Sequence, residues 1–305
     1  MKAIRIHSYG HSDQIHVEEA PRPSPDPGEV LVRIRAAGVN PVDWKIREGY
    51  MKDEGHDPFP LTLGRDFAGE IVEVGEGVRH YKVGDEVFGF ADGSYAEYAK
   101  ASIGLIAHKP STLDFAAAAA LPVAGLTAYQ IITRVVRPNR GQVLLIHGAA
   151  GGVGALVCQL AKWQSARVIA SASIRDAVYL RQLGVDQIID YKSERFEEKA
   201  KDVDAVIDLV GGDTLSRSYS VIKFLGTLVT AVGPLDAVRA QEQGIRAVQF
   251  VMEPNQADLV QVARLADQGT LRPRVSQVIE LTRAREAQDL NQSGASHGKV
   301  ILRVA

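Results

Sequence analysis

The chain has 305 residues, of which 46% are hydrophobic and 24% are charged, and its formal net charge at pH 7 is −2. This composition is typical of a soluble globular protein with a large core, and the near-neutral charge argues against nucleic-acid binding. No apolar run reaches the ~18 residues of a membrane-spanning helix. The single cysteine, Cys158, excludes an internal disulfide and a multi-cysteine zinc cluster. We therefore expect a cytoplasmic protein with no membrane partner, because the N-terminus also lacks the apolar core of a signal peptide.

Residues 1–114 are predicted to be β-rich. Short apolar runs alternate with turns that contain Gly and Pro, a pattern typical of antiparallel strands in a partly closed barrel. The expected strands are 3–6, 30–34, 67–74, 86–90 and 95–99. Two helices are expected within 115–136, with a break near Leu121-Pro122.

From residue 142 to about 252, strands and helices alternate, which predicts a doubly wound parallel sheet of six strands. The expected strands are 143–146, 168–170, 187–189, 205–209, 227–231 and 246–250. The expected helices are 153–163, 175–183, 213–223 and 255–267. The tail returns to β character, with strands at 275–279 and 300–304 and a helix at 283–290. We therefore predict two domains, formed by 1–114 with 268–305 and by 115–267.

The glycine-rich stretch after the first of these strands predicts a dinucleotide site. It runs through Gly148, Ala149, Gly151, Gly152, Val153 and Gly154. The frame Ala149-x-Gly151-x-x-Gly154 lies between a strand and a helix, as the dinucleotide-binding fingerprint requires, with Ala in place of the first Gly. Gly151 would let the backbone approach a pyrophosphate, and Gly154 would let helix and strand pack closely. The alternative is an ordinary glycine-rich turn.

The end of the second strand of this region favours NADPH over NADH. An NAD site usually places a carboxylate there, to bind the ribose 2′-hydroxyl. Here the strand ends in Ser171, Ser173 and Arg175, and the first acid is Asp176. Hydroxyls and a cation suit a 2′-phosphate, which a carboxylate would repel. Alternatively, or in addition, Ser173 caps the following helix.

Six motifs in order along the chain carry a resemblance to a known family. They are Gly38-Val-Asn-Pro-Val-Asp43, Leu63-Gly-Arg-Asp-Phe-Ala-Gly69, Val83-Gly-Asp-Glu-Val87, Leu121-Pro-Val-Ala-Gly-Leu-Thr-Ala128, Gly148-Ala-Ala-Gly-Gly-Val-Gly154 and His297-Gly-Lys-Val300. The chain resembles the medium-chain dehydrogenase/reductase superfamily, in particular its zinc-independent quinone oxidoreductase branch. The resemblance implies a β-rich, partly barrel-like (GroES-like) catalytic domain, a central Rossmann domain that binds NADPH, an active site in the cleft between them, and a homodimer. The apolar segment 246–252 is a candidate edge strand for pairing between subunits.

The resemblance also bears on metal binding. In the zinc alcohol dehydrogenases, the positions that match Asn40, Arg65 and Val123 supply Cys, His and Cys. Asn is a poor zinc ligand, Arg cannot be one and the Val side chain has no donor, so we expect no metal. Without a Lewis acid to activate an alcohol, hydride transfer to an already electrophilic carbon is favoured, in a quinone or an α,β-unsaturated carbonyl (enone or enal).

Such a reaction develops negative charge on the substrate oxygen, so the site needs a hydrogen-bond donor. The candidates are Asn40, Lys45 and Tyr50. Lys45 is equally well interpreted as a surface cation, and Tyr50 is better interpreted as a packing residue. Asp43 would orient Lys45 or bond a backbone turn. Arg65 and Asp66 are expected to form an ion pair, and the expected pocket loop, 49–60, contains no readable specificity code.

The resemblance implies further cofactor contacts. They are expected from Thr127, Tyr191, Asp208, Val210, Gly211, Val232, Gly233, His297 and Lys299, although His297 is equally well interpreted as a surface residue. The sequence thus predicts an NADPH-dependent reductase of quinones or enones, acting on a small-molecule substrate. The alternative is a non-catalytic NADPH-binding protein that serves as a redox sensor or a structural protein.

Overall fold

The computed structural model describes residues 1–52 and 59–304, so residues 53–58 of the expected pocket loop lie outside the described part of the chain. The chain divides into two compact units. The first comprises Met1–Val123, Pro254–Gly269 and Pro273–Ala305, and the second comprises Ala124–Glu253 and Thr270–Arg272. The unit boundaries differ from the predicted domains mainly at 115–123 and 254–267, which belong to the first unit.

The second unit is built on a six-stranded sheet. Its strands are β9 (Val143–His147), β10 (Arg167–Ala172), β11 (Gln187–Asp190), β12 (Val203–Asp208), β13 (Ile222–Thr230) and β14 (Arg246–Gln249). They are ordered β11-β10-β9-β12-β13-β14 and every pairing is parallel. This order reverses direction at β9, which makes the sheet doubly wound and confirms the predicted Rossmann architecture.

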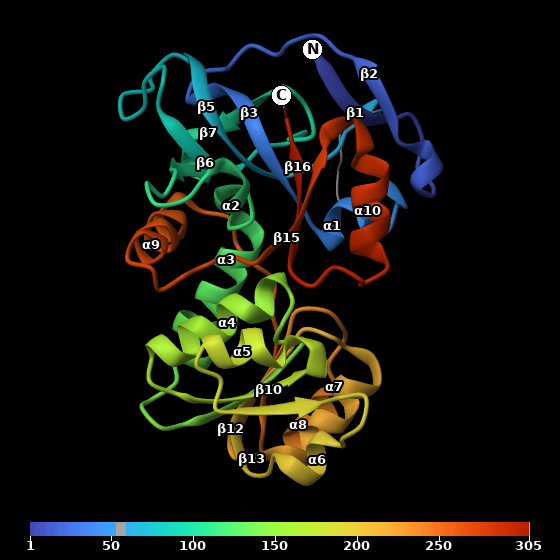
Figure 1. Cartoon of the computed structure of the whole chain (residues 1–305), viewed down its shortest axis with the longest axis vertical. Coiled ribbons are helices and arrows are strands. Elements are labelled where there is room, and N and C mark those ends of the chain that lie inside the picture. The colour runs from blue at the N-terminus through green and yellow to red at the C-terminus, as the bar shows by residue number, and fades with distance from the viewer. Residues whose placement is uncertain (53–58, 305) are drawn as a thin grey trace. The chain divides into compact units, whose positions relative to one another are not determined.

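Helices cover both faces of this sheet. They are α4 (Gly152–Trp163), α5 (Ala177–Gln182), α6 (Phe196–Lys199), α7 (Gly212–Ser218) and α8 (Ala237–Glu242). Helices α4 and α5 lie on one face, and α7 and α8 lie on the other (Figure 1). Right-handed crossovers require this arrangement, because the chain winds in opposite directions from β9. The central strands are therefore covered on both sides, which explains their continuous apolar runs, such as the fully buried Leu144, Leu145 and Ile146.

One predicted helix of this unit is too long. The helix expected at 213–223 ends at Ser218 and is followed by a short 3-10 segment, Tyr219–Val221. Strand β13 then begins at Ile222, which pairs with Val203 of β12. The β-branched pair Val221-Ile222 favours extended backbone here over the helical spacing on which the prediction rested.

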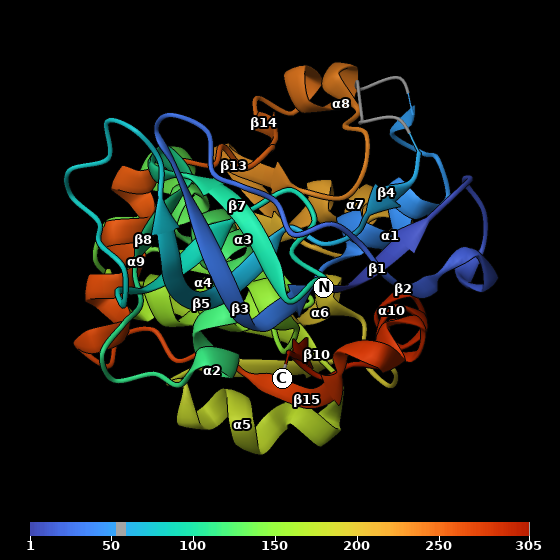
Figure 2. The same cartoon turned by 90° about the horizontal axis from the view of Figure 1, so that it is seen from above.

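The first unit contains two sheets whose strands pair mostly antiparallel. The smaller, ordered β2-β1-β4, consists of β1 (Lys2–Ile6), β2 (His16–Glu19) and β4 (Leu61–Thr62). The larger consists of β3 (Glu29–Val39), β5 (Asp66–Val74), β6 (Glu86–Phe90), β7 (Tyr98–Ser102), β8 (Ile106–His108), β15 (Val275–Glu280) and β16 (Lys299–Arg303). Its order is β15-β16-β3-β5-β6-β8, with β7 also paired to β3. Figure 2 shows β3, β5 and β7 side by side. This unit is the predicted β-rich, GroES-like domain.

Helices complete the first unit and lead into the second. They are α1 (Pro41–Arg47), α2 (Phe115–Ala119), α9 (Gln256–Asp267) and α10 (Ala284–Gln292), with α3 (Pro122–Gln130) and a π-helical turn, Ile131–Val136, at the transition. Helix α9 packs against β8, and α10 lies beside α1 (Figure 1). Strand β16 pairs antiparallel with β3, so the C-terminal segment completes the larger sheet.

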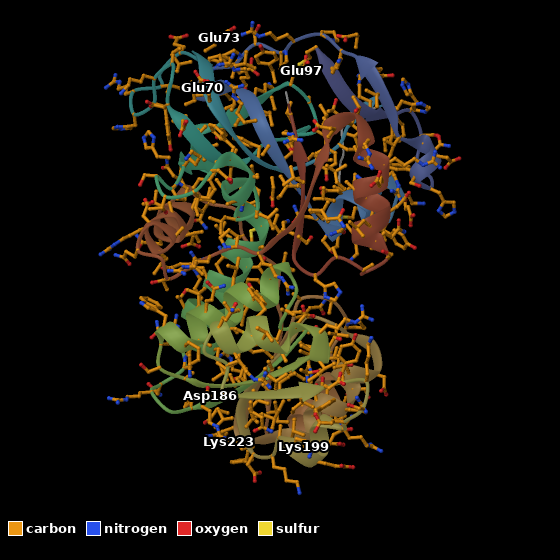
Figure 3. All side chains as sticks on the ribbon, in the orientation of Figure 1. Glu70, Glu73, Glu97, Asp186, Lys199 and Lys223 are labelled. Carbon is orange, nitrogen blue, oxygen red and sulfur yellow. The ribbon has the colours of Figure 1, made fainter. Side chains whose placement is uncertain are left out.

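Charged side chains surround both units (Figure 3). Glu70 pairs with Arg33 and Arg35 on the first unit, and Lys223 pairs with Asp204 on the second. These pairs are partly exposed, so each contributes little to stability. Within the described ranges, the helices are all too short or too polar to cross a bilayer.

Candidate active site and cofactor site

The start of helix α1 organises the candidate catalytic residues. Asn40 occupies the N-cap with extended backbone, Pro41 takes the first helical position, and Asp43 follows at the third. The Asn40 backbone N–H donates to Asp43 Oδ2 at 2.7 Å, and the Asp43 N–H donates to the Asn40 carbonyl at 3.0 Å. These contacts satisfy backbone groups that a helix start leaves unpaired. This helix was not among the predicted elements, although Asn-Pro-x-Asp is a helix-start pattern.

Asp43 also contacts Tyr95, which was not among the predicted site residues. The Tyr95 hydroxyl donates to Asp43 Oδ2 at 2.7 Å. Both side chains are buried, and Asp43 Oδ1 has no hydrogen-bond partner. Burial is the main cause that raises the pKa of Asp43 to about 6, and it also raises the pKa of Tyr95 well above 10. Of the two roles expected for Asp43, the structure shows the bond to a backbone turn.

A second buried group lies beside the first. Lys299 Nζ donates to the Val39 carbonyl at 3.0 Å and to Asn40 Oδ1, and lies 3.5 Å from Asp66 Oδ2. Burial raises the pKa of Asp66, while the charge of Lys299 opposes that rise. Lys299 was expected to contact the cofactor. Its ammonium lies inside the first unit, because the pairing of β16 with β3 places it next to Val39.

The predicted ion pair between Arg65 and Asp66 is wrong. Arg65 lies 3.8 Å from Asp92, whereas Asp66 pairs with Lys299 and accepts the Val123 N–H at 3.3 Å. Asp66 begins a strand, and neighbouring residues along a strand point to opposite faces. The half-buried Arg65 therefore faces away from the buried Asp66.

Lys45 and Tyr50 do not join this buried group. Lys45 Nζ lies 5.7 Å from the centroid of the Trp44 ring, and Tyr50 meets the same ring edge-on at 6.1 Å. Tyr50 is 72% exposed. The structure thus brings Asn40 and Asp43 together, whereas Lys45 and Tyr50 lie beside the Trp44 ring.

The three positions that carry zinc ligands in the zinc alcohol dehydrogenases offer few side-chain atoms that could bind a metal. Asn40 Oδ1 is held by Lys299, Arg65 is a cation, and Val123 contributes only its backbone N–H. Among residues 1–52 and 59–304, no three His, Cys, Asp or Glu side chains are arranged to hold a metal.

The glycine-rich turn joins β9 to α4, between a strand and a helix as the sequence predicted. Gly148 follows β9 with φ +70°, and α4 begins at Gly152. A Cβ on Gly154 would lie 2.2 Å from the Gly148 carbonyl oxygen, and one on Gly151 would lie 3.3 Å from the same atom. The turn can therefore fold this closely against the helix only because Gly154 lacks a side chain, whereas a Cβ on Gly151 would be tight. No side-chain hydrogen bond caps the N-terminus of α4 at Gly151, and a helix N-terminus of this kind favours an anion such as a pyrophosphate.

The expected 2′-phosphate residues lie at the carboxyl end of β10. Ser171 and Ser173 are buried, and Arg175 is exposed. Ser173 occupies the N-cap of a 3-10 segment, Ile174–Asp176, but its side chain makes no capping hydrogen bond. The alternative of a helix cap therefore does not account for this hydroxyl.

The remaining expected cofactor residues of the second unit follow neighbouring strands. Because the strands are parallel, their carboxyl ends meet at one edge of the sheet, where ligands of such sheets bind. Tyr191, Val210 and Val232 are exposed at the ends of β11, β12 and β13, next to Gly211 and Gly233, and Thr127 is buried on α3. Asp208, also expected to contact the cofactor, is the last residue of β12. Its buried carboxylate accepts the N–H groups of Val210 and Gly211 and the Thr230 hydroxyl, so it shapes the turn after β12.

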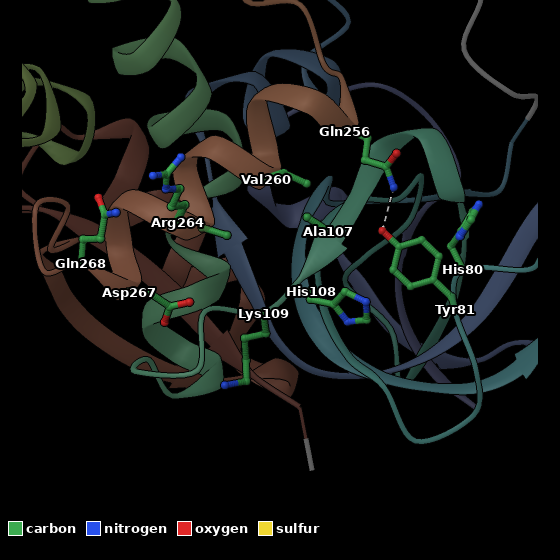
Figure 4. A pocket seen from close by; sticks show the side chains of 11 residues that line it. His80, Tyr81, Ala107, His108, Lys109, Gln256, Val260, Arg264, Asp267 and Gln268 are labelled. Atoms are coloured by element: carbon green, nitrogen blue, oxygen red, sulfur yellow. Dashed lines mark hydrogen bonds between the residues drawn. The ribbon is translucent and has the colours of Figure 1, made fainter.

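A hollow of about 620 Å³ in the first unit contains none of the predicted site residues. Its lining includes the tilted ring pair Tyr81 and His108, 5.1 Å apart, and Arg264 of α9. The Tyr81 hydroxyl accepts a hydrogen bond from Gln256 at 2.8 Å (Figure 4). Because this hollow shares no residue with the buried polar group or the glycine turn, the candidate site rests on those two features. His297, which was also expected to contact the cofactor, is exposed.

Comparison with known proteins identifies the family. Residues 26–111 match the family described as "Alcohol dehydrogenase GroES-like domain", and residues 183–302 match "Zinc-binding dehydrogenase". The chain is 30% identical over 323 residues to a chloroplast envelope quinone oxidoreductase homolog of Arabidopsis thaliana, covering 99% of this chain and 98% of the relative. It is 34% identical over 317 residues to a 2-methylene-furan-3-one reductase of Solanum lycopersicum, covering 99% and 79%. The chain belongs to the medium-chain dehydrogenase/reductase superfamily, among its quinone oxidoreductases.

Solved quinone oxidoreductases share the fold along the whole chain. The Coxiella burnetii enzyme is 35% identical, with a TM-score of 0.92 over 100% of this chain and 99% of that one. The Escherichia coli enzyme, solved in complex with NADPH, is 27% identical, with a TM-score of 0.91 over 100% of both chains. This member of the superfamily is thus an oxidoreductase that uses a nicotinamide cofactor.

Proposed function

We propose that this oxidoreductase transfers hydride from NADPH to a quinone or to the β-carbon of an enone or enal, without zinc. The observation that carries the proposal is the Asn40 amide. Its Nδ2 is buried and makes no hydrogen bond of ordinary geometry, although the amide helps to lower the pKa of the nearby Asp66. A buried donor without a good partner costs about 1–3 kcal/mol. A substrate oxygen that gains negative charge would supply the acceptor.

The choice of NADPH rests on the carboxyl end of β10. When bound, NADPH supplies the hydride. Ser171 and Ser173 would donate hydroxyl hydrogen bonds to the 2′-phosphate, and Arg175 would add a charge-assisted contact. The glycine turn, Gly148 to Gly154, would hold the pyrophosphate. The Escherichia coli relative, solved with NADPH, supports the same cofactor.

The substrate class rests on the donor set of the first unit. An enone or quinone carries its own electrophilic carbon, so it needs a hydrogen-bond donor but no Lewis acid. The tomato relative, named as a furanone reductase, and the named quinone oxidoreductases support this class. Zinc independence follows from Asn40, Arg65 and Val123, whose side chains leave no usable set of ligands.

NADPH oxidation over a panel of quinones, enals and enones tests the proposal. We expect turnover with at least one class, at full rate in the presence of a chelator and without stoichiometric zinc in the purified protein. Asn40→Ala should lower kcat for the best substrate by roughly 10²–10³-fold, because one oxyanion donor is lost. Lys45→Met should have a smaller effect, because that ammonium lies over Trp44.

Three outcomes would contradict parts of this proposal. Asn40→Ala with a change in kcat below threefold would remove Asn40 as the donor. Stoichiometric zinc whose removal abolishes activity would overturn zinc independence. NADPH binding without turnover of any panel compound would favour the alternative of a non-catalytic redox sensor or structural protein.

We also propose that the protein is a homodimer that pairs through β14. This strand is one of the two outer strands of the six-stranded sheet, and Val251 just beyond it is 78% exposed. A free apolar strand edge is a ready template for pairing with a second chain. Analytical ultracentrifugation should give twice the 33.0 kDa chain mass, and Val248→Lys should shift the protein toward the monomer. A wild-type mass of 33.0 kDa would refute the dimer.

A further inference from the structure

Lys299 is a buried cation whose hydrogen-bonding capacity is used within the first unit. It is 5% exposed, and its ammonium meets the Val39 carbonyl, Asn40 Oδ1 and Asp66 Oδ2. A lysine ammonium has three protons and accepts no hydrogen bond. Three acceptors therefore saturate it, and no proton remains for a cofactor phosphate.

The position of Lys299 is fixed by the backbone on both sides. The next residue, Val300, pairs with Val39 across β16 and β3, and the Lys299 N–H donates to the Arg274 carbonyl at 2.7 Å. Gly38, one residue before Val39, lets this region pack closely, since a Cβ there would lie 2.4 Å from the Ala119 carbonyl oxygen. The ammonium is thus held beside Asn40 by strand pairing and not by a flexible loop.

This contact decides which way the Asn40 amide points. The two ends of an amide have nearly the same shape, and only their hydrogen-bond partners distinguish the oxygen from the NH₂ group. Lys299 can only donate, so Oδ1 must face it, and Nδ2 lies at the other end of the amide, where it helps to lower the pKa of Asp66. Reversing the amide would place an NH₂ group against the ammonium and present an oxygen where a donor is needed.

Asp66 completes the arrangement by balancing the charge. Its fully buried carboxylate accepts the Val123 N–H and lies beside Lys299, whose charge opposes the rise that burial causes in its pKa. A buried ion pair tolerates removal of both charges better than removal of one, because a lone buried charge lacks compensation. This property gives a way to remove Lys299 without leaving an unpaired carboxylate.

We propose that Lys299 is a positioning residue for hydride transfer, because it holds Asn40 Oδ1 and thereby fixes Nδ2 as the donor to the substrate oxygen. The inference rests on the proposed function of Asn40. It assigns Lys299 to the acid side of the reaction and not to cofactor binding.

A double-mutant cycle on Lys299 and Asn40 tests this role. Lys299→Met keeps most of the stem and removes the charge. We expect it to lower kcat about ten- to a hundredfold, part of the loss typical of an oxyanion donor, with the KM for NADPH changed less than threefold. In an Asn40→Ala background the same change should lower kcat less than threefold further, because the group that Lys299 orients is gone.

Two kinetic outcomes would overturn the proposal. An equal loss of kcat in the presence and absence of Asn40 would show a general structural effect. A KM for NADPH raised tenfold or more at unchanged kcat would return Lys299 to the cofactor site. If Lys299→Met does not fold, as judged by thermal unfolding, the cycle is run with Lys299→Met/Asp66→Asn, which removes both buried charges.

A readout that needs no substrate separates this inference from the proposed function. In protein labelled at asparagine, the Asn40 side-chain amide gives NMR signals that Asn40→Ala identifies by their loss. Lys299→Met should shift or split these signals, because Asn40 Oδ1 loses the partner that holds it, whereas Lys45→Met should leave them in place. If the wild type reduces no panel compound, the proposed function fails. Unchanged Asn40 signals in Lys299→Met, with or without turnover, would overturn the positioning role.

Discussion

The Tyr95 hydroxyl donates a 2.7 Å hydrogen bond to Asp43 Oδ2, joining two buried side chains that lie 52 positions apart in the chain. The same oxygen accepts the Asn40 N–H, so this carboxylate ties the start of α1 to the segment before β7. Asp43 Oδ1 is buried without a partner. Ionising a buried carboxylate with an unpaired oxygen costs folding free energy, and the pH determines whether the group is ionised.

Asp43 is expected to make the protein less stable as the pH rises from about 4 to 6. Its pKa is 3.8 ordinarily and about 6 in the folded chain, mainly because of burial. The unfolded chain therefore releases this proton first as the pH rises, and unfolding is favoured by roughly 3 kcal/mol above pH 6. Asp43→Asn can still accept from Tyr95 and has no charge to bury, so the difference in unfolding free energy between the variant and the wild type should grow over this range.

Urea unfolding at pH 4 and pH 7 measures this difference, with the exposed Asp13→Asn as a control. A constant difference between Asp43→Asn and the wild type at both pH values would contradict the assigned burial of the charge.

His147 is expected to act in the opposite direction. It is fully buried at the end of β9, and its Nε2 lies 3.2 Å from the Ser218 hydroxyl. Burial, helped by the charge of Arg217, lowers its pKa from 6.5 to about 4. The unfolded chain takes up a proton first as the pH falls, so the wild type should lose roughly 3 kcal/mol between pH 6.5 and 4. His147→Gln should lack this loss.

The same unfolding experiment reports on this residue, with the exposed His80→Gln as the matched control. A wild type and a His147→Gln variant that lose stability in parallel on acidification would show that His147 is not the sensitive group.

Local patterns in the sequence were sufficient to predict the six-stranded sheet of the second unit. Its strands are apolar runs bounded by turns, and the glycine spacing at 148–154 marks one strand end by itself. Because all six strands are parallel, the carboxyl ends of the neighbouring strands lie at the same edge of the sheet as the predicted dinucleotide turn. Asp208 is the exception, since its position was predictable but its three hydrogen bonds to the turn and to Thr230 were not.

The buried polar group of the first unit could not be predicted in this way. Lys299 and Asn40 are 259 positions apart, and they meet because β16 pairs with β3 in a particular register. The prediction paired Asp66 with its neighbour Arg65, since sequence alone offers only near neighbours. Strand geometry points those two side chains apart. Partners set by long-range pairing need the fold before they can be assigned.

Gly154→Ala tests the close packing of the dinucleotide turn. The added Cβ would lie 2.2 Å from the Gly148 carbonyl oxygen and 2.8 Å from Ala149 Cα, which are backbone atoms that cannot turn aside. We expect a loss of about 1–3 kcal/mol in unfolding free energy and at least tenfold weaker NADPH binding. Gly104→Ala is the control, because its Cβ would meet only a Ser102 hydroxyl at 3.8 Å. Unchanged NADPH affinity in Gly154→Ala would remove this turn from the cofactor site.

Arg175→Ala tests the preference for NADPH. Arg175 is exposed beyond the carboxyl end of β10, close in sequence to Ser171 and Ser173. No acidic residue lies between the start of β10 at Arg167 and Asp176. A hydrogen bond to a charged group contributes roughly 1.5–3 kcal/mol, so the affinity for NADPH should fall about ten- to a hundredfold. The affinity for NADH should change little, because that cofactor has a hydroxyl where NADPH has the phosphate. Fluorescence titration with both cofactors measures the difference, and Arg181→Ala, on α5, controls for the loss of a nearby cation. Equal wild-type affinities for the two cofactors, or equal losses for both in Arg175→Ala, would show that this strand end does not read the 2′-phosphate.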